Sequence, residues 1–335
     1  MDRKLKILYA IINSYIVNGE PVGSRTLSKN LGINASSATI RNDMSDLEDM
    51  GLLEKTHISS GRIPSEKAYR FYIDKLLEYG IDNYHIPQIT DSREKDTSIE
   101  LEAIINNATN FLASITNYAA ISLMPDMKDV ILRHFAIFPL NNHDLVLVYI
   151  YDNQVVKNKV VKLKRPFNKL QISYVERLLK SRIEDRSLSE ISDLLGIDEI
   201  KLENGQYILD ELIPEIKESI DADAGVKYKI EGTTNLLQYD EFSDANNTRT
   251  IIESLKDSQT IIPLLAKNVG EDIEIYIGRE NGIEEYKDLS IILGSFKIKG
   301  NLTGKLGVIG PVRMEYLKVI RDVSLMCRYI SLISN

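Results

Sequence analysis

The first seventy-five residues carry the pattern that most restricts the fold, because three short helical stretches are followed there by two short strand-like stretches. Apolar residues recur at helical spacing over residues 3–18, and Asn18-Gly19-Glu20-Pro21 ends that stretch. Ser24 is placed as the N-cap of a short second helix, which Gly32 ends. Polar residues then open a third helix over residues 36–50.

The third stretch has a single apolar stripe, which indicates a helix with one side packed on a core. Its apolar positions are Ile40, Met44 and Leu47, at i, i+4 and i+7. Residues 52–55 and 56–58 then alternate like two short strands that turn near Ser59-Ser60-Gly61. Three helices followed by a hairpin is the order of a winged helix-turn-helix.

The side of the third helix opposite the stripe carries residue types that can read bases in the major groove. At about 100° per residue, this outer arc holds Ala38, Arg41, Asn42 and Ser45, with Ser37 and Thr39 beside it. Arginine can hold guanine with two hydrogen bonds, asparagine can hold adenine, and a small apolar group can meet the thymine methyl. Asp46 and Asp49 follow. Since they would repel phosphates, we expect the helix to enter the groove by its N-terminal half.

The remaining candidate DNA contacts lie at the start of the third helix, on the second helix and in the wing. They are Ser36, whose hydroxyl and neighbouring backbone N–H groups suit a phosphate, with Ser24, Arg25, His57, Gly61 and Arg62. Arg62, beside the hairpin tip, is the expected phosphate or minor-groove contact. Taken alone, the third helix is equally well explained as an amphipathic helix with a solvated polar side. The capped second helix and the basic wing favour DNA binding.

The net charge of the chain is compatible with a nucleic-acid partner when the N-terminal part and the remainder are counted separately. The whole chain has a formal net charge of −8, but residues 1–75 hold eleven Lys or Arg and nine Asp or Glu. Phosphate attraction depends on a local basic surface rather than on the total charge. A weakly basic N-terminal part on an acidic remainder therefore allows DNA binding and predicts modest attraction by each subunit.

The rest of the chain alternates between strand and helix patterns, which favours an α+β class for the whole molecule. We expect helices over 65–79, 99–116, 170–195, 207–220 and 315–333, and strands over 119–124, 131–140, 145–151, 155–163, 260–265, 273–277, 289–297 and 306–309. Strands, a helical block and further strands indicate an α+β domain interrupted by an inserted subdomain. The expected domains are a winged helix over 1–80, a linker over 81–98, a first α+β part over 99–164, a mainly helical insert over 165–222 and a second part over 223–335.

The sequence gives no pattern for catalysis, a metal or a cofactor. The four histidines lack the spacing of metal ligands. The single cysteine, Cys327, cannot form an internal disulfide, which fits the reducing cytoplasm, and it lies on the apolar stripe of the last helix. No apolar run is long enough to span a bilayer. We therefore expect a cytoplasmic regulator without cofactor rather than an enzyme.

Several motifs closely resemble the bacterial heat-inducible transcription repressor family, HrcA. They are Ser37-Ala38-Thr39-Ile40-Arg41-Asn42-Asp43-Met44, the wing His57-Ile58-Ser59-Ser60-Gly61-Arg62-Ile63-Pro64-Ser65, Tyr69-Arg70-Phe71-Tyr72-Ile73-Asp74, Ile277-Gly278 with Glu280-Asn281, and Gly304 to Pro311 with Arg313-Met314 and Tyr316. The resemblance implies a winged helix followed by a GAF-like domain with an inserted dimerisation domain. It further implies a homodimer that represses chaperone operons at an inverted repeat and a partnership with the chaperonin GroEL.

Two other functions remain open at this point. A GAF-like domain can bind a small molecule, so a ligand-responsive repressor is the main alternative. A winged helix used only for protein contacts is the second, and it predicts no salt-dependent binding to palindromic DNA. For the dimer, we expect the main contact in the helical insert over 165–222, because its apolar stripes exceed what a small subdomain buries alone.

Overall fold

The computed structural model describes residues 3–30, 35–56, 61–78, 101–153, 155–197, 205–267, 272–298 and 302–334. The expected helix end at Gly32, the turn at 59–60, His57 and the linker over 81–98 lie outside these ranges. Contacts divide the chain into two compact units. The first contains Met1–Leu123, Tyr228–Phe296 and Lys305–Ile333, and the second contains Met124–Lys227, Lys297–Gly304 and Ser334–Asn335.

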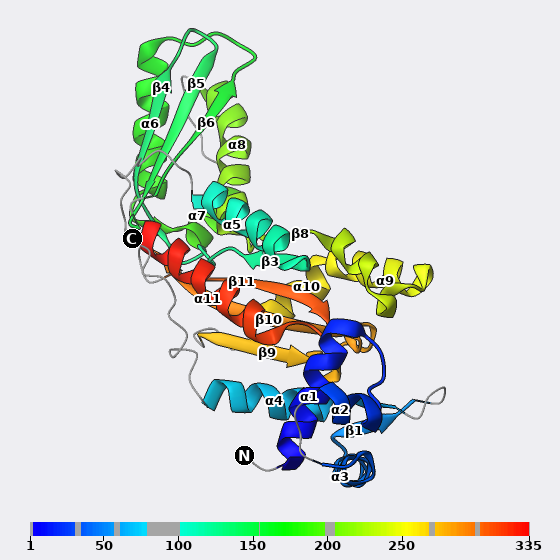
Figure 1. The fold of residues 1–335 in the computed structure, drawn as a ribbon. Coiled ribbons are helices and arrows are strands. Elements are labelled where there is room, and N and C mark those ends of the chain that lie inside the picture. Colours follow the sequence, from blue (N-terminus) through cyan, green and yellow to red (C-terminus); the bar gives the residue numbers. More distant parts are fainter. Residues whose placement is uncertain are drawn as a thin grey trace. The chain divides into compact units, whose positions relative to one another are not determined.

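The first unit begins with the expected winged helix (Figure 1). Its elements are α1 (Arg3–Asn18), α2 (Ser24–Asn30), α3 (Ser37–Asp49), β1 (Leu53–Lys55), β2 (Arg62–Pro64) and α4 (Glu66–Glu78). The strands pair antiparallel, with Leu53 opposite Pro64. The stripe of α3, which is Ile40, Met44 and Leu47, is buried against the apolar side of α1. The predicted order of three helices and a hairpin is therefore confirmed, but the second strand is Arg62–Pro64 and not residues 56–58, of which only Thr56 is described and it is not in a strand.

The remainder of the first unit is an α+β domain built on a five-stranded sheet in the order β8-β3-β11-β10-β9. Its strands are β3 (Ala119–Leu123), β8 (Tyr228–Glu231), β9 (Ile273–Ile277), β10 (Leu289–Ile298) and β11 (Leu302–Pro311). Its helices are α5 (Leu101–Thr116), α9 (Ala245–Leu255), α10 (Ser258–Leu265) and α11 (Tyr316–Ile333), with short 3₁₀ turns at Thr233–Gln238, Asp240–Phe242, Gly278–Asn281 and Glu284–Tyr286.

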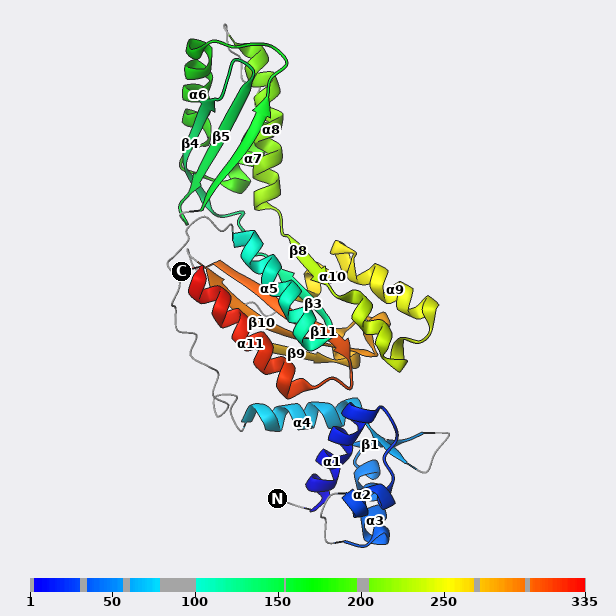
Figure 2. The same cartoon turned by 45° about the horizontal axis from the view of Figure 1, so that its top comes forward.

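Helices cover both faces of this sheet. Helices α5 and α11 lie side by side on one face (Figures 1 and 2). Their contact with the sheet is close, because a Cβ on Gly294 of β10 would lie 2.7 Å from Cys327 Sγ of α11. Helices α9 and α10 bury Ile251 and Ile261 against the other face. Cys327 is buried, as its place on the apolar stripe of the last helix predicts.

One expected strand is a helix. Residues 258–265 form α10, whose N-cap Asp257 accepts a hydrogen bond from the backbone N–H of Gln259. The buried residues Ile261, Leu264 and Leu265 follow one another at i, i+3 and i+4, which is helical spacing. A short apolar run does not distinguish a buried helix from a buried strand, and the capping aspartate was the signal that favoured a helix.

The second unit is larger than the predicted helical insert. Its sheet has the order β6-β5-β4-β7 and contains β4 (Ile131–Pro139), β5 (Asp144–Tyr151), β6 (Val156–Lys162) and β7 (Arg186–Ser187). Helices α6 (Lys169–Ile183), α7 (Leu188–Ile197) and α8 (Gln206–Ala224) share one apolar core with these strands. The expected bounds 165–222 are thus corrected to about 124–227, because the helices bury their stripes on strands that we had placed in the α+β domain.

No helix among the residues that the structure describes is long and apolar enough to cross a membrane. Over those same residues, no cluster of histidine, cysteine, aspartate and glutamate is arranged to hold a metal ion.

Candidate nucleic-acid interface

The outer arc of α3 faces solvent. Its four residues, Ala38, Arg41, Asn42 and Ser45, are all exposed, whereas the opposite stripe is buried. The helix begins at a capped end, because Ser36 Oγ accepts a hydrogen bond of 3.1 Å from the backbone N–H of Thr39. The arc predicted from spacing therefore forms one continuous surface on a helix with a defined start.

The hydroxyl residues near this start contact one another. Ser24 Oγ of α2 lies 3.1 Å from Ser37 Oγ of α3, and Ser36 Oγ lies 2.9 Å from Thr39 Oγ1. The first contact joins α2 to the N-terminus of α3, and the second lies within the capped start of α3. Arg25 is exposed on α2, one residue after this junction. Ser24 itself is the first residue of α2 rather than its N-cap, and the N–H groups of Thr26 and Leu27 bond to the Gly23 carbonyl.

Two acidic residues of α3, Asp43 and Asp46, are paired with cations of α1. Asp43 is only 4% exposed, and Arg3 donates to both of its carboxylate oxygens at 2.7 and 3.0 Å. These hydrogen bonds hold the pKa of Asp43 below its usual range, although burial acts in the opposite direction. Lys4 pairs with Asp46 at 2.8 Å. The sequence analysis missed Asp43, although its position three residues after Ile40 places it on the buried side.

Arg62 of the wing, which the sequence predicts as a phosphate or minor-groove contact, is paired with an acidic residue of α3. Its Nε and Nη2 lie 2.9 and 2.8 Å from Glu48 Oε2, and its side chain is only 13% exposed. Lys55 of β1 lies 3.0 Å from the other oxygen of Glu48. Hydrogen bonds from Lys55 and then from Arg62 lower the pKa of Glu48. Arg62 therefore ties the wing to α3, and its predicted contact with a phosphate stays a prediction.

Gly61 also has a packing role. It is buried, and a Cβ at this position would lie 2.8 Å from Pro21 Cβ and 2.9 Å from the Pro21 carbonyl carbon. Beside it, the backbone of Arg62 exchanges two hydrogen bonds with Val22, at 2.9 and 3.0 Å. Glycine thus lets the wing approach the segment between α1 and α2. His57 lies outside the described residues, so its predicted contact stays a prediction.

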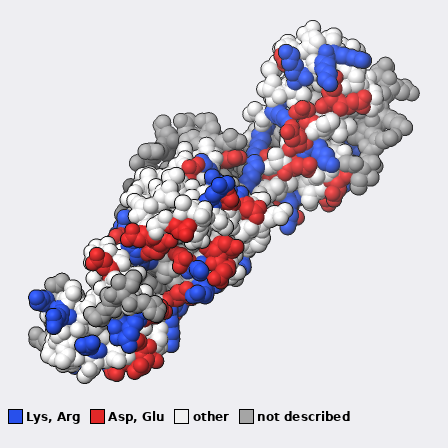
Figure 3. Space-filling model, turned by 90° about the vertical axis from the view of Figure 1, so that its right-hand side faces the viewer, with Lys and Arg blue, Asp and Glu red and all other residues white. Residues whose placement is uncertain are grey.

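The charge on the winged helix is mixed. In Figure 3, where the winged helix lies at the lower end, patches of Lys and Arg lie next to patches of Asp and Glu. Exposed basic residues there include Lys6, Arg25, Lys29 and Arg41. A surface of this kind gives moderate phosphate attraction, so base contacts by the arc would have to supply much of the specificity.

One solved structure resembles the whole chain. A crystal structure described only as that of a hypothetical protein matches with a TM-score of 0.74 and 24% sequence identity, and the match covers 99% of this chain and 98% of that one. This similarity supports the fold of a winged helix followed by an α+β domain.

Sequence comparisons identify the family. A heat-inducible transcription repressor HrcA from Thermoanaerobacter sp. (strain X514) is 35% identical over 336 residues, which cover 100% of this chain and 97% of that protein. The protein of the same name from Halalkalibacterium halodurans is 34% identical and covers 96% and 94%. Family models for the HrcA winged helix-turn-helix DNA-binding domain and for the HrcA C-terminal domain match residues 2–75 and 102–320. The chain belongs to the HrcA family of heat-inducible transcription repressors.

Proposed function

We propose that this repressor acts as a homodimer that inserts one α3 helix of each subunit into successive major-groove segments of an inverted-repeat operator. The observation that carries the proposal is the exposed arc of α3, which has Arg41 and Asn42 at its centre. Arg41 would hold a guanine and Asn42 an adenine, while Ala38 and Ser45 fit thymine methyl or polar base edges. The two-fold symmetry of a dimer matches the symmetry of an inverted repeat.

The supporting contacts divide into two groups. Ser36, Ser37 and Thr39 lie at the N-terminus of α3, where hydroxyl and N–H groups suit a phosphate, and Arg25 and Ser24 adjoin them on α2. Arg62 and Gly61 instead position the wing, through Glu48 and Pro21. We therefore assign the direct contacts to α2 and α3. His57 remains a candidate contact of the wing.

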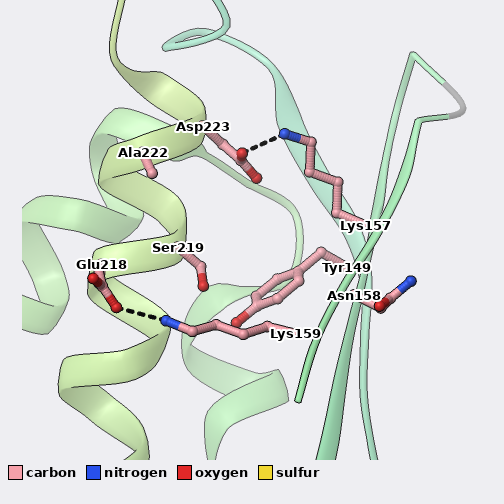
Figure 4. A pocket seen from close by; sticks show the side chains of 8 residues that line it. All are labelled: Tyr149, Lys157, Asn158, Lys159, Glu218, Ser219, Ala222 and Asp223. Carbon is pink, nitrogen blue, oxygen red and sulfur yellow. Dashed lines mark hydrogen bonds and ion pairs between the residues drawn. The ribbon is translucent and has the colours of Figure 1, made fainter. Parts of the chain in front are cut away.

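The dimer surface that we propose is the open face of the sheet in the second unit. The other face is covered by helices, and ion pairs between β6 and α8 hold that layer in place. Lys159 lies 2.6 Å from Glu218, and Lys157 pairs with Asp223 at 2.5 Å beside a cavity of about 370 Å³ (Figure 4). The apolar stripes of α6, α7 and α8 are buried in the unit's own core. Our expectation that these stripes form the dimer contact is therefore replaced.

The open face is largely apolar across three adjacent strands. Phe138, Val146 and Val160 form one row by register. The second row contains Ala136, Val148 and the polar Asn158, and the third contains His134, Ile150 and Val156. Phe138, Val156 and Val160 are 55%, 59% and 61% exposed. An exposed apolar sheet face of this kind usually marks an interaction surface. A second copy of the same face is its proposed occupant, because an inverted-repeat operator needs two winged helices held together.

Membership of the family supports two further proposals. Release of the operator on heat stress would follow if the chaperonin GroEL keeps the repressor active and unfolded proteins compete for the chaperonin. We also expect the protein in the cytoplasm, where its operator lies. A ligand-responsive repressor is not favoured, because the matched relatives are named as heat-inducible repressors.

A footprint on the DNA upstream of the protein's own gene and of chaperone genes tests the operator. Protection of an inverted repeat by the wild-type chain, lost on Arg41→Ala and Asn42→Ala, supports the proposal, and absence of any protected palindrome contradicts it. Adding GroEL to the same reaction should raise the protected fraction, and adding unfolded protein should lower it again. An unchanged fraction in both reactions would remove the chaperonin from the proposal.

A further inference from the structure

Residues from opposite ends of the chain meet behind the winged helix. Tyr69 and Arg70 belong to an N-terminal motif on which the family resemblance rests, whereas Glu280 belongs to one C-terminal motif and Arg313 and Tyr316 belong to another. In the structure, these two groups contact each other across more than 200 residues of sequence. DNA contact by α3 does not use any of them, so their meeting needs a separate explanation.

The first contact joins α4 to the turn after β9. Arg70 donates from Nε to Glu280 Oε1 at 2.9 Å, from Nη2 to Glu280 Oε2, and from Nη2 to the Ile275 carbonyl at 2.7 Å. Glu280 is itself held, because its Oε2 accepts from the backbone N–H of Ile277 at 2.9 Å. A planar guanidinium with three fixed acceptors specifies a direction as well as a distance.

The same turn approaches the first residues of α4. Gly278 has φ +53°, and a Cβ there would lie 2.5 Å from Glu66 Oε1 and 2.9 Å from the Lys287 carbonyl. Arg279 pairs with Glu66 at 3.3 Å. The turn therefore needs glycine, both for its backbone conformation and for the space that Glu66 occupies.

The second contact joins the end of α1 to Arg313. Arg313 Nε lies 2.5 Å from Glu241 Oε1, and Nη1 lies 3.5 Å from the Ile16 carbonyl in the last turn of α1. The guanidinium also lies over the Tyr239 ring, 5.5 Å from its centre. With only 12% of its side chain exposed, Arg313 is well shielded from water. A cation at a helix C-terminus is favourably placed.

Apolar packing between the winged helix and the sheet domain is incomplete. Tyr69 and Tyr316 contact each other with ring centres 5.7 Å apart. Beside them, a cavity of about 400 Å³ is lined by residues of both parts, including Tyr15, Tyr69 and Arg313. A tightly packed core would fix the angle between two bodies by shape alone. Here the packing does not fix that angle by itself. The contacts of Arg70, which lies on α4, and of Arg313, which reaches the end of α1, supply the directional constraints.

We propose that Arg70 and Arg313 are positioning residues that fix the orientation of the winged helix on the α+β domain and thereby set the half-site spacing that the repressor selects. This inference rests on the proposed dimer and inverted-repeat operator. The arginines act through Glu280 and Glu241 and touch no base. Without these arginines, each winged helix should still read a half-site. The two winged helices of the dimer should no longer be held at the distance and angle that match the two half-sites.

The test uses the full chain and the footprinted operator in three forms: native, with the spacer changed by one to five base pairs, and as a single half-site. The double variant Arg70→Ala with Arg313→Ala should bind the half-site like wild type but bind the native operator at least about tenfold more weakly, because simultaneous engagement is lost. It should also discriminate less between spacers. The charge reversal Arg70→Glu with Glu280→Arg should recover part of the native spacing preference.

Two matched variants keep the outcome interpretable. Glu280→Gln with Glu241→Gln removes charge without changing volume and should reproduce the effect if the alanine variant misfolds. Arg249→Ala removes an exposed ion pair on α9, away from the junction, and should behave like wild type. An unchanged spacing preference in both junction variants overturns the inference, and so does an equal loss on half-site and operator. Failure of the wild type to bind any inverted repeat would instead refute the proposed function.

Discussion

The Arg3–Asp43 pair gives a prediction whose size follows from the burial of its two partners. Asp43 has 5% of its side chain exposed, whereas Arg3 has 51%. Replacing Arg3 by alanine leaves a buried carboxylate with two lost hydrogen bonds. Replacing Asp43 by asparagine leaves a guanidinium that water already reaches. We therefore expect Arg3→Ala to cost more stability than Asp43→Asn.

General magnitudes set the scale of the two effects. Hydrogen bonds to charged groups contribute about 1.5–3 kcal/mol, and breaking a fully buried pair costs about 3–5 kcal/mol. Since one partner here is half exposed, solvent screening reduces these values. We expect a loss of about 2 kcal/mol for Arg3→Ala and about 1 kcal/mol for Asp43→Asn. The double variant should lose less than the sum, because the buried charge is gone.

Hydrogen exchange of the full chain, read on peptides from α1 and α3, measures these losses locally and avoids the assumption that the whole molecule unfolds in one step. Peptides from α6 serve as an internal control, because α6 belongs to the other unit. Equal protection of α1 and α3 in wild type and Arg3→Ala, or a larger loss in Asp43→Asn, would refute the reasoning from burial.

The same pair predicts a dependence on pH. The folded-state pKa of Asp43 is lowered, so its contribution to stability is present above the unfolded pKa of about 4 and is lost as the pH falls through the folded value. The difference in melting temperature between wild type and Arg3→Ala should therefore be full at pH 7 and shrink below about pH 4. A difference that stays constant down to pH 3 would contradict this assignment.

Four further substitutions address DNA binding, assembly and the sheet. Arg41→Ala should weaken operator binding by roughly 1–3 kcal/mol and reduce the base preference at one operator position. Arg62→Ala should leave the salt dependence of binding unchanged. Gel shifts on operator variants at several salt concentrations measure both effects, and a smaller salt slope for Arg62→Ala would show that Arg62 contacts a phosphate. Val146→Asp should convert the dimer to monomers in sedimentation, with the same change at an exposed valine of α1, Val17→Asp, as control. A persisting dimer would exclude the open face. Gly307→Ala should destabilise the sheet strongly, because its Cβ would lie 2.2 Å from the Ile292 carbonyl oxygen, and an unchanged melting temperature would show that the strands can separate there at little cost.

Local pattern predicted the winged helix well, because its helices are short and its apolar stripe and capping residues are near in sequence. Ile40 and Ser36 are enough to orient α3, and the exposed arc follows from them. The same reasoning failed where a side chain's partner is not in the pattern. The pairing of Arg62 with Glu48, fourteen residues earlier, could not be predicted from the pattern of the wing.

Contacts between residues far apart in the sequence could not be predicted from periodicity. Nothing near Arg70 indicates that Glu280 completes its contacts, and nothing near the helical stripes of 170–195 indicates that strands β4 and β5 cover them. Strand residues such as Leu147 alternate in the same way whether their sheet belongs to one domain or to another. Assigning them to the correct unit required the three-dimensional contacts.

The pairing of charges within the winged helix explains how a surface with so small a net charge can serve DNA. Asp43 and Asp46 are paired with Arg3 and Lys4 of α1, which reduces the negative charge that α3 presents to DNA. The arc then presents Arg41 as its charged group. A surface of this kind predicts few phosphate contacts, so in the proposed dimer the joint binding of two subunits would supply much of the affinity. In that dimer, a contact that fixes the angle between the winged helix and the α+β domain would affect which operators are selected, as the base-reading residues do.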